Sequence, residues 1–249
     1  EINNPLGYVW SEFRSLRTIM NKYPKSDEHA GTVTEMVGAI EDGLSRIEKV
    51  VGSLLEYSRR GGRQQGTVSA YDLVKGINTA LELSHGDYDR IAGIELDLQP
   101  LPELKAYGNE IDQVLLNIIR NAVDAIKERL EVCHEADNSI EPVPPQSGFC
   151  GSAGRPGHIR ISCRVENDLV VCEIGNNGSP LDAGQTESIF NAFFSTKPGD
   201  RGTGLGLSIS REIIEKHHGG RLTLSSFDPV VFRIELPINP TWPRPVMRP

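Results

Sequence analysis

A glycine-rich run carries the clearest chemical signal in this sequence. It leads directly into an apolar pattern typical of a helix, and its residues are Gly202, Thr203, Gly204, Leu205, Gly206 and Leu207. The backbone N–H groups of such a loop and the positive end of the helix dipole together bind phosphate. Lys197 lies shortly upstream and adds a point charge. Neither the Walker A spacing nor the Rossmann order of strand, glycines, helix and acidic residue is present, so the run predicts a phosphate site of another kind.

A second stretch places polar side chains on an otherwise apolar helix. Asn117, Asn121 and Asp124 have the spacing i, i+4 and i+7, so they share one helix face. Polar groups on a face that should be buried need partners, and Mg²⁺ with phosphates is one such partner because hard cations take amide and carboxylate oxygens. A solvated helix face is the simpler alternative, since polar positions on helices are common.

A third stretch, Asn176–Pro180, follows a predicted strand. Asn176 offers an acceptor and two donors to the edge of an adenine base. Gly178 permits a tight turn or a close approach of the backbone to a ligand. An Asn-Asn-Gly sequence is also an ordinary turn, so this stretch alone does not establish a site.

The residues around these stretches predict an α+β scaffold. Helices are expected at Tyr71–Leu83, from Gly108 through Ile126 with Asn109 as N-cap, and at Leu205–His217. Strands are expected at Ile94–Leu98, Ile159–Val165, Leu169–Ile174, Arg221–Ser226 and Val230–Leu236, the last two joined by a turn at Asp228–Pro229. This order predicts a mostly antiparallel sheet covered on one face by helices, with a mobile Pro-rich insertion near residues 134–157 and a Pro-rich tail at 238–249.

The N-terminal part has a different pattern. Apolar residues recur at alternating steps of four and three from Ile2 to Tyr23 and again from Val33 to Leu54, which predicts an antiparallel helical hairpin over residues 1–62. The polar, Gly-rich segment Arg59–Gly66 is the expected linker to the second domain. An exposed apolar stripe on each helix favours a homodimer that closes a four-helix bundle; packing of the hairpin onto its own second domain is the alternative.

Composition restricts the function classes. The chain has 249 residues and a net charge of -8, which argues against a general nucleic-acid binder. No apolar run is long enough to span a membrane, so no membrane contact is expected within this segment. Cys163 and Cys172 fall in apolar alternations and indicate a reduced, cytoplasmic compartment, whereas a zinc site of Cys133, His134 and Cys150 would lack the usual metal spacing.

In this order, the three stretches resemble the N, G1, F and G2 boxes of sensor histidine kinases of two-component systems. The ATP-binding domain of those kinases belongs to the superfamily that also holds gyrase and the mismatch-repair ATPases. The most specific matches are FFSTK at Phe193–Lys197, GTGLGLSIS at Gly202–Ser210 and HHGG at His217–Gly220. The resemblance covers nearly the whole chain and implies a phosphoacceptor hairpin at 1–62 and an α/β sandwich that binds ATP at 67–237.

The resemblance also implies roles for individual residues. Asn121 matches the Mg²⁺ ligand, and Asn117 is its neighbour that faces the phosphates. Gly204 and Gly206 match the backbone cradle for the phosphates, and Phe190–Lys197 matches the beginning of a lid. The implied cofactors are ATP and Mg²⁺.

The first residues, Glu1–Leu6, resemble the H-box. In this family the phosphoacceptor histidine comes immediately before the glutamate, so the acceptor is expected just before residue 1. The resemblance makes Glu1 a general base on the acceptor imidazole and makes Asn4 the group that orients water in a phosphatase reaction. For Glu1, an exposed residue in the first turn of a helix is the alternative.

The G1 box departs from the family pattern at two positions. Asn176 stands where the family has an aspartate that accepts from the adenine amino group, and Pro180 replaces a glycine. An asparagine still accepts through its amide oxygen but loses the charge-assisted part of the bond, about 1 kcal/mol. We therefore expect adenine to bind more weakly or in a different pose.

The resemblance implies a kinase core that autophosphorylates a histidine and passes the phosphoryl group to an aspartate of a response-regulator receiver domain. A pseudokinase scaffold that binds nucleotide and signals by docking is the alternative. An ATPase clamp of the gyrase type would need a glutamate general base at the position of Asn117, so the asparagine argues against it.

Overall fold

The computed structural model describes residues 13–14, 17–18, 35–40, 43–44, 47, 67–136, 156–182, 184, 186–194 and 203–240. The chain divides into two compact units. One comprises Glu1–Gln65 and Ala192–Leu205, and the other comprises Gly66–Asn191 and Gly206–Pro249.

The described residues of the N-terminal segment are helical. Phe13 and Val37 are buried, whereas Met36, Ile40 and Ile47 are exposed. Helical backbone in both halves of the segment agrees with the hairpin pattern in the sequence. The linker Arg59–Gly66 lies outside the described residues.

The second unit is built on a mixed sheet with the order β2-β4-β5-β7-β6. These strands are β2 (Ala92–Leu98), β4 (Gly157–Glu166), β5 (Leu169–Asn176), β7 (Val230–Pro237) and β6 (Arg221–Phe227). The pair β2–β4 is parallel and the other pairs are antiparallel, so the sheet is mostly antiparallel, as predicted; the parallel pair itself was not predicted. A separate antiparallel pair, β1 (Ser69–Tyr71) and β3 (Leu104–Ala106), was not predicted, because strands this short show too little alternation to be recognised.

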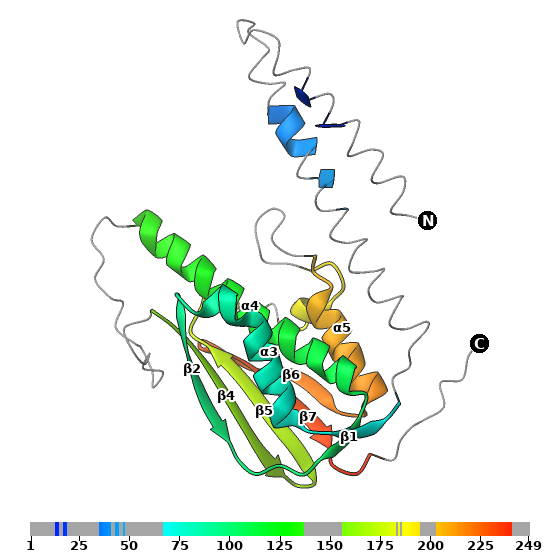
Figure 1. The fold of residues 1–249 in the computed structure, drawn as a ribbon. Coiled ribbons are helices and arrows are strands. Elements are labelled where there is room, and N and C mark those ends of the chain that lie inside the picture. Colours follow the sequence, from blue (N-terminus) through cyan, green and yellow to red (C-terminus); the bar gives the residue numbers. More distant parts are fainter. Residues whose placement is uncertain are drawn as a thin grey trace, which may run out of the picture. The chain divides into compact units, whose positions relative to one another are not determined.

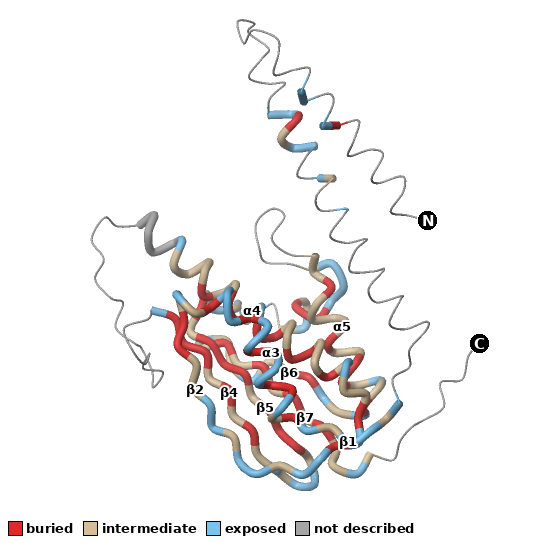
Figure 2. The backbone as a smooth tube through the Cα atoms, viewed as in Figure 1, coloured by how far each residue is buried: buried red, intermediate tan, exposed pale blue. Residues whose placement is uncertain are grey.

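The helices cover one face of this sheet (Figure 1). They are α3 (Leu73–Tyr88), α4 (Gly108–Ala136) and α5 (Gly206–Glu212), which continues as the π-helical turn η5 (Ile213–His217); a short 3-10 turn, η3, spans Ser188–Phe190. The core lies between the two layers (Figure 2). Its side chains include Ile77, Leu81, Val114, Ile118, Ile161, Cys163, Cys172, Ile174, Phe232 and Ile234.

Helix α3 begins two residues later than the sequence pattern suggests. Asp72 is its N-cap, and the Asp72 side chain accepts from Lys75 N at 3.1 Å. Tyr71 instead belongs to β1, and its hydroxyl donates to Asp112 Oδ1 at 2.6 Å. This bond joins the small β1–β3 pair to α4.

Helix α4 begins at Gly108, so the prediction that Asn109 caps it is wrong. The N–H groups of Glu110 and Ile111 donate to the Tyr107 carbonyl at 2.9 and 3.2 Å. Tyr107 N–H is itself bound by His218 Nε2 at 3.1 Å, a contact between residues far apart in sequence. The helix also runs to Ala136, so residues 134–136 of the predicted insertion are helical, and residues 137–155 lie outside the described part of the chain.

Candidate functional site

The polar stripe of α4 is neither fully buried nor fully solvated. Asn117, Asn121 and Asp124 are all half-buried, while Ile118 and Val123 on the neighbouring face are at most 1 % exposed. A stripe of amide and carboxylate oxygens thus borders the apolar core. Partial burial disfavours the simple solvated-face alternative, because these groups have lost part of their hydration.

Helix α5, which begins at the last glycine of the glycine-rich run, contacts this stripe at Asn117. Asn117 Nδ2 donates to Ser210 Oγ at 3.0 Å, and Ser210 is buried. A Cβ placed on Gly206, the first residue of α5, would overlap the carboxamide of Asn117. The start of α5 and the polar face of α4 are therefore in direct contact, and only glycine permits that approach.

The turn after β5 docks on the same helix, beside Asp124. A Cβ on Gly178 would meet the α4 backbone at Ala125, and Ser179 N donates to the Ala125 carbonyl at 2.9 Å. Arg129 Nη1 donates to the Asn177 carbonyl at 2.6 Å. These contacts bring the predicted G1 and N stretches together.

Asn176 lies at the end of β5 on the helix-covered face of the sheet. It pairs in register with Ile159, whose side chain is fully buried, and Asn176 itself is 2 % exposed. Its Oδ1 accepts from Gly178 N at 3.0 Å, which closes the turn.

The segment Ala192–Leu205 belongs to the other unit and has its own local geometry. Phe193 N donates to the Gly204 carbonyl at 2.9 Å, and a Cβ on Gly204 would overlap the Phe193 backbone. Gly204 has a φ of 65°, which glycine adopts freely. Leu205 N is 3.4 Å from Thr203 Oγ1. Of the predicted site residues, Glu1, Asn4, Lys197 and Gly202 lie outside the described residues, and Leu207 is half-buried in α5.

Two adjacent histidines connect η5 to the beginning of α4. His218 is buried; because its Nε2 accepts from Tyr107 N–H, its Nδ1 carries the proton and donates to the Ile213 carbonyl at 2.9 Å. Burial lowers the pKa of His218. His217 Nδ1 lies 2.9 Å from Glu110 Oε2, and this hydrogen bond raises the pKa of His217.

The donor set agrees with a hard cation rather than a zinc-type centre. Within the described ranges, no group of three or more His, Cys, Asp or Glu side chains could hold a metal ion. Two amides and one carboxylate on one helix face suit Mg²⁺, which keeps several waters and shares phosphate oxygens as ligands.

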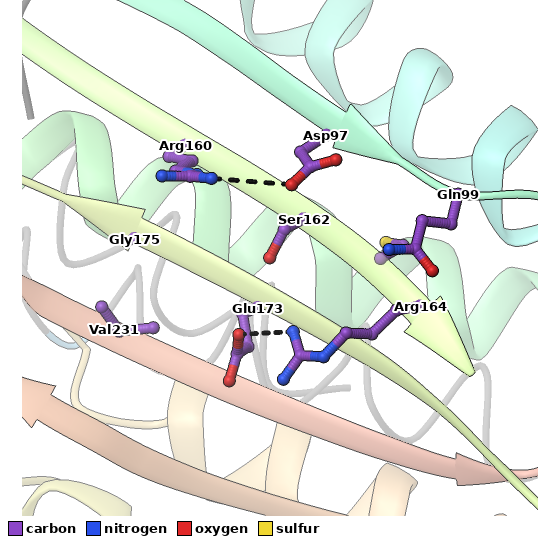
Figure 3. A pocket seen from close by; sticks show the side chains of 9 residues that line it. Asp97, Gln99, Arg160, Ser162, Arg164, Glu173, Gly175 and Val231 are labelled. Carbon is purple, nitrogen blue, oxygen red and sulfur yellow. Dashed lines mark hydrogen bonds and ion pairs between the residues drawn. The ribbon is translucent and has the colours of Figure 1, made fainter. Parts of the chain in front are cut away.

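A cavity of about 280 Å³ lies elsewhere, against the sheet residues that point away from the core (Figure 3). Its charged walls are paired with each other: Arg160 lies 3.5 Å from Asp97, and Arg164 lies 2.7 Å from Glu173. Such internally neutralised walls offer no excess charge to an anionic ligand. The candidate site lies instead at α4, the β5 turn and the start of α5, where the predicted residues meet.

Sequence reasoning missed Ser210 and Arg129. Ser210 follows Gly206 by four residues and Arg129 follows Ala125 by four, so each lies one helical turn beyond a contact residue. That spacing places each residue on the same helix face as its contact residue. It predicts a contact only once the element packed against that face is known.

The comparisons with known proteins agree with this geometry. The family model described as Histidine kinase-, DNA gyrase B-, and HSP90-like ATPase matches residues 107–240. The signal transduction histidine-protein kinase AtoS of Escherichia coli (strain K12) is 29% identical over 244 residues, which are 96% of this chain and 34% of AtoS. The C4-dicarboxylate transport sensor protein DctB of Rhizobium meliloti is 28% identical over 234 residues, or 91% of this chain and 31% of DctB. The chain thus spans about a third of these relatives.

Solved structures show the same architecture. The catalytic domain of histidine kinase ThkA has a TM-score of 0.53 and 26% identity, covering 70% of this chain and 97% of that one. ThkA in complex with the response regulator protein TrrA has a TM-score of 0.60 and 23% identity, covering 96% of this chain and 60% of that one, which supports the fold alone. The predicted fold class, a helical hairpin followed by an α/β domain, is confirmed. With the family model on more than half of the chain and sensor kinases matched along nearly all of it, the resemblance to sensor histidine kinases is confirmed: the chain belongs to the histidine kinase-, DNA gyrase B- and HSP90-like ATPase family.

Proposed function

We propose that this chain is the core of a histidine protein kinase that binds Mg-ATP, phosphorylates a histidine on its helical hairpin and passes the phosphoryl group to a response-regulator aspartate. The observation that carries the proposal is the contact of Gly206 with the Asn117 carboxamide, which joins a glycine-rich helix start to a face of oxygen ligands. That combination suits a polyphosphate with its cation.

The nucleotide would be held mainly through its phosphates. Backbone N–H groups of Gly202–Leu207 would cradle the phosphates, with Lys197 as a point charge. Asn121 would hold Mg²⁺, with Asn117 and Asp124 beside it; when bound, the cation neutralises charge that develops on the phosphate oxygens. Asn176 and Gly178 would meet the base, since their turn lies against α4.

Catalysis in this proposal consists of positioning and charge stabilisation. An imidazole nitrogen of the acceptor attacks the γ-phosphorus, the bond from that phosphorus to the β–γ bridging oxygen breaks, and ADP leaves. Glu1 would keep the acceptor imidazole in its nucleophilic form by holding its other N–H. Asn4 would orient a water for a separate phosphatase reaction, in which that water takes up the phosphoryl group and inorganic phosphate leaves.

The partners in the proposal are a second copy and a receiver domain. Apolar Met36, Ile40 and Ile47 are exposed in the described hairpin residues, which supports a homodimer through residues 1–62. The relative ThkA was solved with a response regulator, which supports a receiver domain as the phosphoryl acceptor. Residues 67–237 would be the ATP-binding domain and would act in the cytoplasm. No helix among the described residues is long and apolar enough to cross a membrane.

A nucleotide-binding scaffold without kinase activity is the second candidate. It is favoured by one observation, the amide Asn176 with its oxygen already engaged by Gly178 N–H. Such a protein would bind nucleotide and dock its partner without transferring phosphate.

Radiolabel transfer distinguishes the two candidates. A protein that carries this chain with a histidine immediately before Glu1 is incubated with Mg²⁺ and ATP labelled at the γ-phosphate. The kinase proposal expects an acid-labile label on the protein, lost when that histidine is replaced by Gln. Binding of nucleotide without any label would instead support the scaffold.

A further inference from the structure

The HHGG motif, His217–Gly220, ends the helical run that begins at the proposed phosphate site, and the proposed function gives this motif no role. Helix α5 starts at Gly206 and continues directly as the π-helical turn η5. Such turns are rare and are frequent at functional sites. Gly219 has a φ of 64°, and a Cβ on Gly220 would overlap the carbonyl oxygen of Glu235 on β7. The two glycines therefore let the chain turn closely onto the sheet, and the two histidines remain to be explained.

Both histidines bond to the beginning of α4. His217 Nδ1 lies 2.9 Å from Glu110 Oε2 in the first turn of that helix. His218 Nε2 accepts from Tyr107 N–H at 3.1 Å, and the two rings meet edge to face with their centroids 5.8 Å apart. The other nitrogen of His218, Nδ1, donates to the Ile213 carbonyl at 2.9 Å. One buried ring thus joins η5 to the residue that precedes α4. We call His217 and His218 the histidine clamp.

The histidine clamp acts on the helix face that carries the candidate site. Glu110 precedes Asn117 by seven residues, which is two helical turns, so both lie on the polar face of α4. The helical run from Gly206 meets this face first at Asn117, where Ser210 also bonds, and again at the clamp. Two helices that touch at one place can tilt about that contact, whereas a second contact further along fixes their crossing.

We propose that His217 and His218 are positioning residues for nucleotide binding: they fix the far end of the α5–η5 run against α4 and so keep Gly206 beside Asn117. This inference rests on the proposed function, because it requires that α4 and the start of α5 bind a nucleotide together. The histidines themselves need not touch the ligand. A shift of about 1 Å in a binding group is enough to cost up to about a hundredfold in activity, so a remote contact of this kind has a measurable effect.

Two substitutions of His218 separate positioning from a local structural role. In His218→Asn the short amide can still donate to the Ile213 carbonyl but does not reach Tyr107. In His218→Gln the longer amide can still accept from Tyr107 N–H. Calorimetric titration of the whole chain with Mg-ATP, at a temperature at which thermal unfolding shows each variant to be folded, gives the dissociation constants.

We expect His218→Asn to bind Mg-ATP about tenfold more weakly than wild type, because the tie to α4 is lost. His218→Gln should bind within about twofold of wild type, because it keeps that tie. A merely structural ring would lower the melting temperature of both variants without separating their affinities.

A substitution on α4 tests the second contact of the histidine clamp. Glu110→Ala removes the partner of His217 from a half-buried surface position and should weaken Mg-ATP binding about threefold. Glu82→Ala is the matched control, since it removes an exposed glutamate of α3 and should leave the affinity unchanged. If His218→Asn does not fold, Glu110→Ala decides by itself.

Equal affinities of His218→Asn and His218→Gln, or an undiminished affinity of Glu110→Ala, overturn the inference and leave the proposed function intact. A wild-type chain that binds no Mg-ATP overturns the proposed function and the inference with it.

Discussion

Gly206 is packed so closely against Asn117 that no side chain larger than a hydrogen atom fits there. A Cβ there would overlap the carboxamide of Asn117, and Asn117 is held in place by its bond to Ser210 Oγ. Moving Asn117 aside would break that bond and displace an oxygen from the polar face of α4. The effect of a methyl group at this position should therefore appear in ligand binding.

Gly206→Ala should weaken Mg-nucleotide binding by about tenfold or more, because it displaces a group beside the proposed phosphate site. It should not unfold the protein, since alanine is a better helix former than glycine by about 1 kcal/mol. Calorimetric titration and thermal unfolding measure the two effects. Gly86→Ala is the matched control: Gly86 lies in α3 with open space around its Cβ, so only stability should rise. Equal nucleotide affinity in the two variants would contradict this account of Gly206.

The adjacent histidines should respond to pH in opposite directions. The folded pKa of His217 is raised by Glu110, so the stability it contributes is fully present below its unfolded pKa of 6.5 and is lost as pH rises through the folded value. The folded pKa of His218 is lowered by burial, so the stability that goes with neutral His218 is present above 6.5 and is lost as pH falls.

Thermal unfolding of His217→Gln and His218→Gln at about pH 5 and about pH 8 tests this opposition. Relative to wild type, His217→Gln should lose more stability at the lower pH, because only there is the ion pair with Glu110 complete. His218→Gln should lose more stability, relative to wild type, at the higher pH. The same trend in both variants would show that the two rings are not held as described.

The spacing of residues in the sequence predicted their positions correctly where those positions depend only on the local helix geometry. The i, i+4, i+7 spacing of Asn117, Asn121 and Asp124 was enough to place them on one face of α4. The cap at Asn109 was wrong because Tyr107 is held by His218, a residue from the far end of the domain. No local pattern predicts such a contact.

At the scale of elements, the sheet has a neutralised outer face. Arg233 on β7 contacts Glu166 at 2.6 Å, Glu173 at 3.0 Å and Glu235 at 2.8 Å. Arg164 on β4 also contacts Glu173 and is the main cause of the lowered pKa of that carboxyl. Arg233 lowers the pKa further. This network links β4, β5 and β7 across the face that no helix covers.

Arg233→Gln should destabilise the sheet, because Glu235 then loses its cationic partner and Glu166 and Glu173 are left to share Arg164. We expect the melting temperature to fall by about 3 °C at low ionic strength and by less in about 1 M salt. Arg221→Gln on the edge strand β6 is the control, since Arg221 is exposed and none of the described ion pairs includes it. A loss for Arg221→Gln as large as that for Arg233→Gln would contradict the role given to the network.

Long elements with a regular pattern of buried residues could be predicted from the sequence, and short elements could not. The alternation of β4 and β7 and the apolar face of α3 follow directly from burial of every second or every third to fourth residue. The pair β1–β3 and the π-helical turn at Ile213–His217 depend on tertiary contacts. For the same reason the sequence predicted the three stretches of the candidate site but not the way in which α4 connects them.

At the scale of the whole molecule, the net charge of -8 coexists with a proposed site for a polyanion. The carboxylates on the outer face of the sheet are paired with arginines, so they contribute little field at α4. Local N–H groups, Lys197 and Mg²⁺ would neutralise the phosphates without a basic surface. The expected hairpin roles of Glu1 and Asn4 lie outside the described residues and depend on the acceptor experiment.

The central claim is that the polar face of α4 binds a Mg-nucleotide. The most direct test is calorimetric titration of the whole chain with Mg-ATP, beside Asn121→Ala and the control Asn78→Ala, which removes an exposed asparagine of α3. We expect saturable, Mg²⁺-dependent binding in the wild-type chain and in Asn78→Ala, weakened by about tenfold or more in Asn121→Ala, as is usual when a metal site loses a supporting group. Absence of nucleotide binding in the wild-type chain, or undiminished binding in Asn121→Ala, would contradict the account.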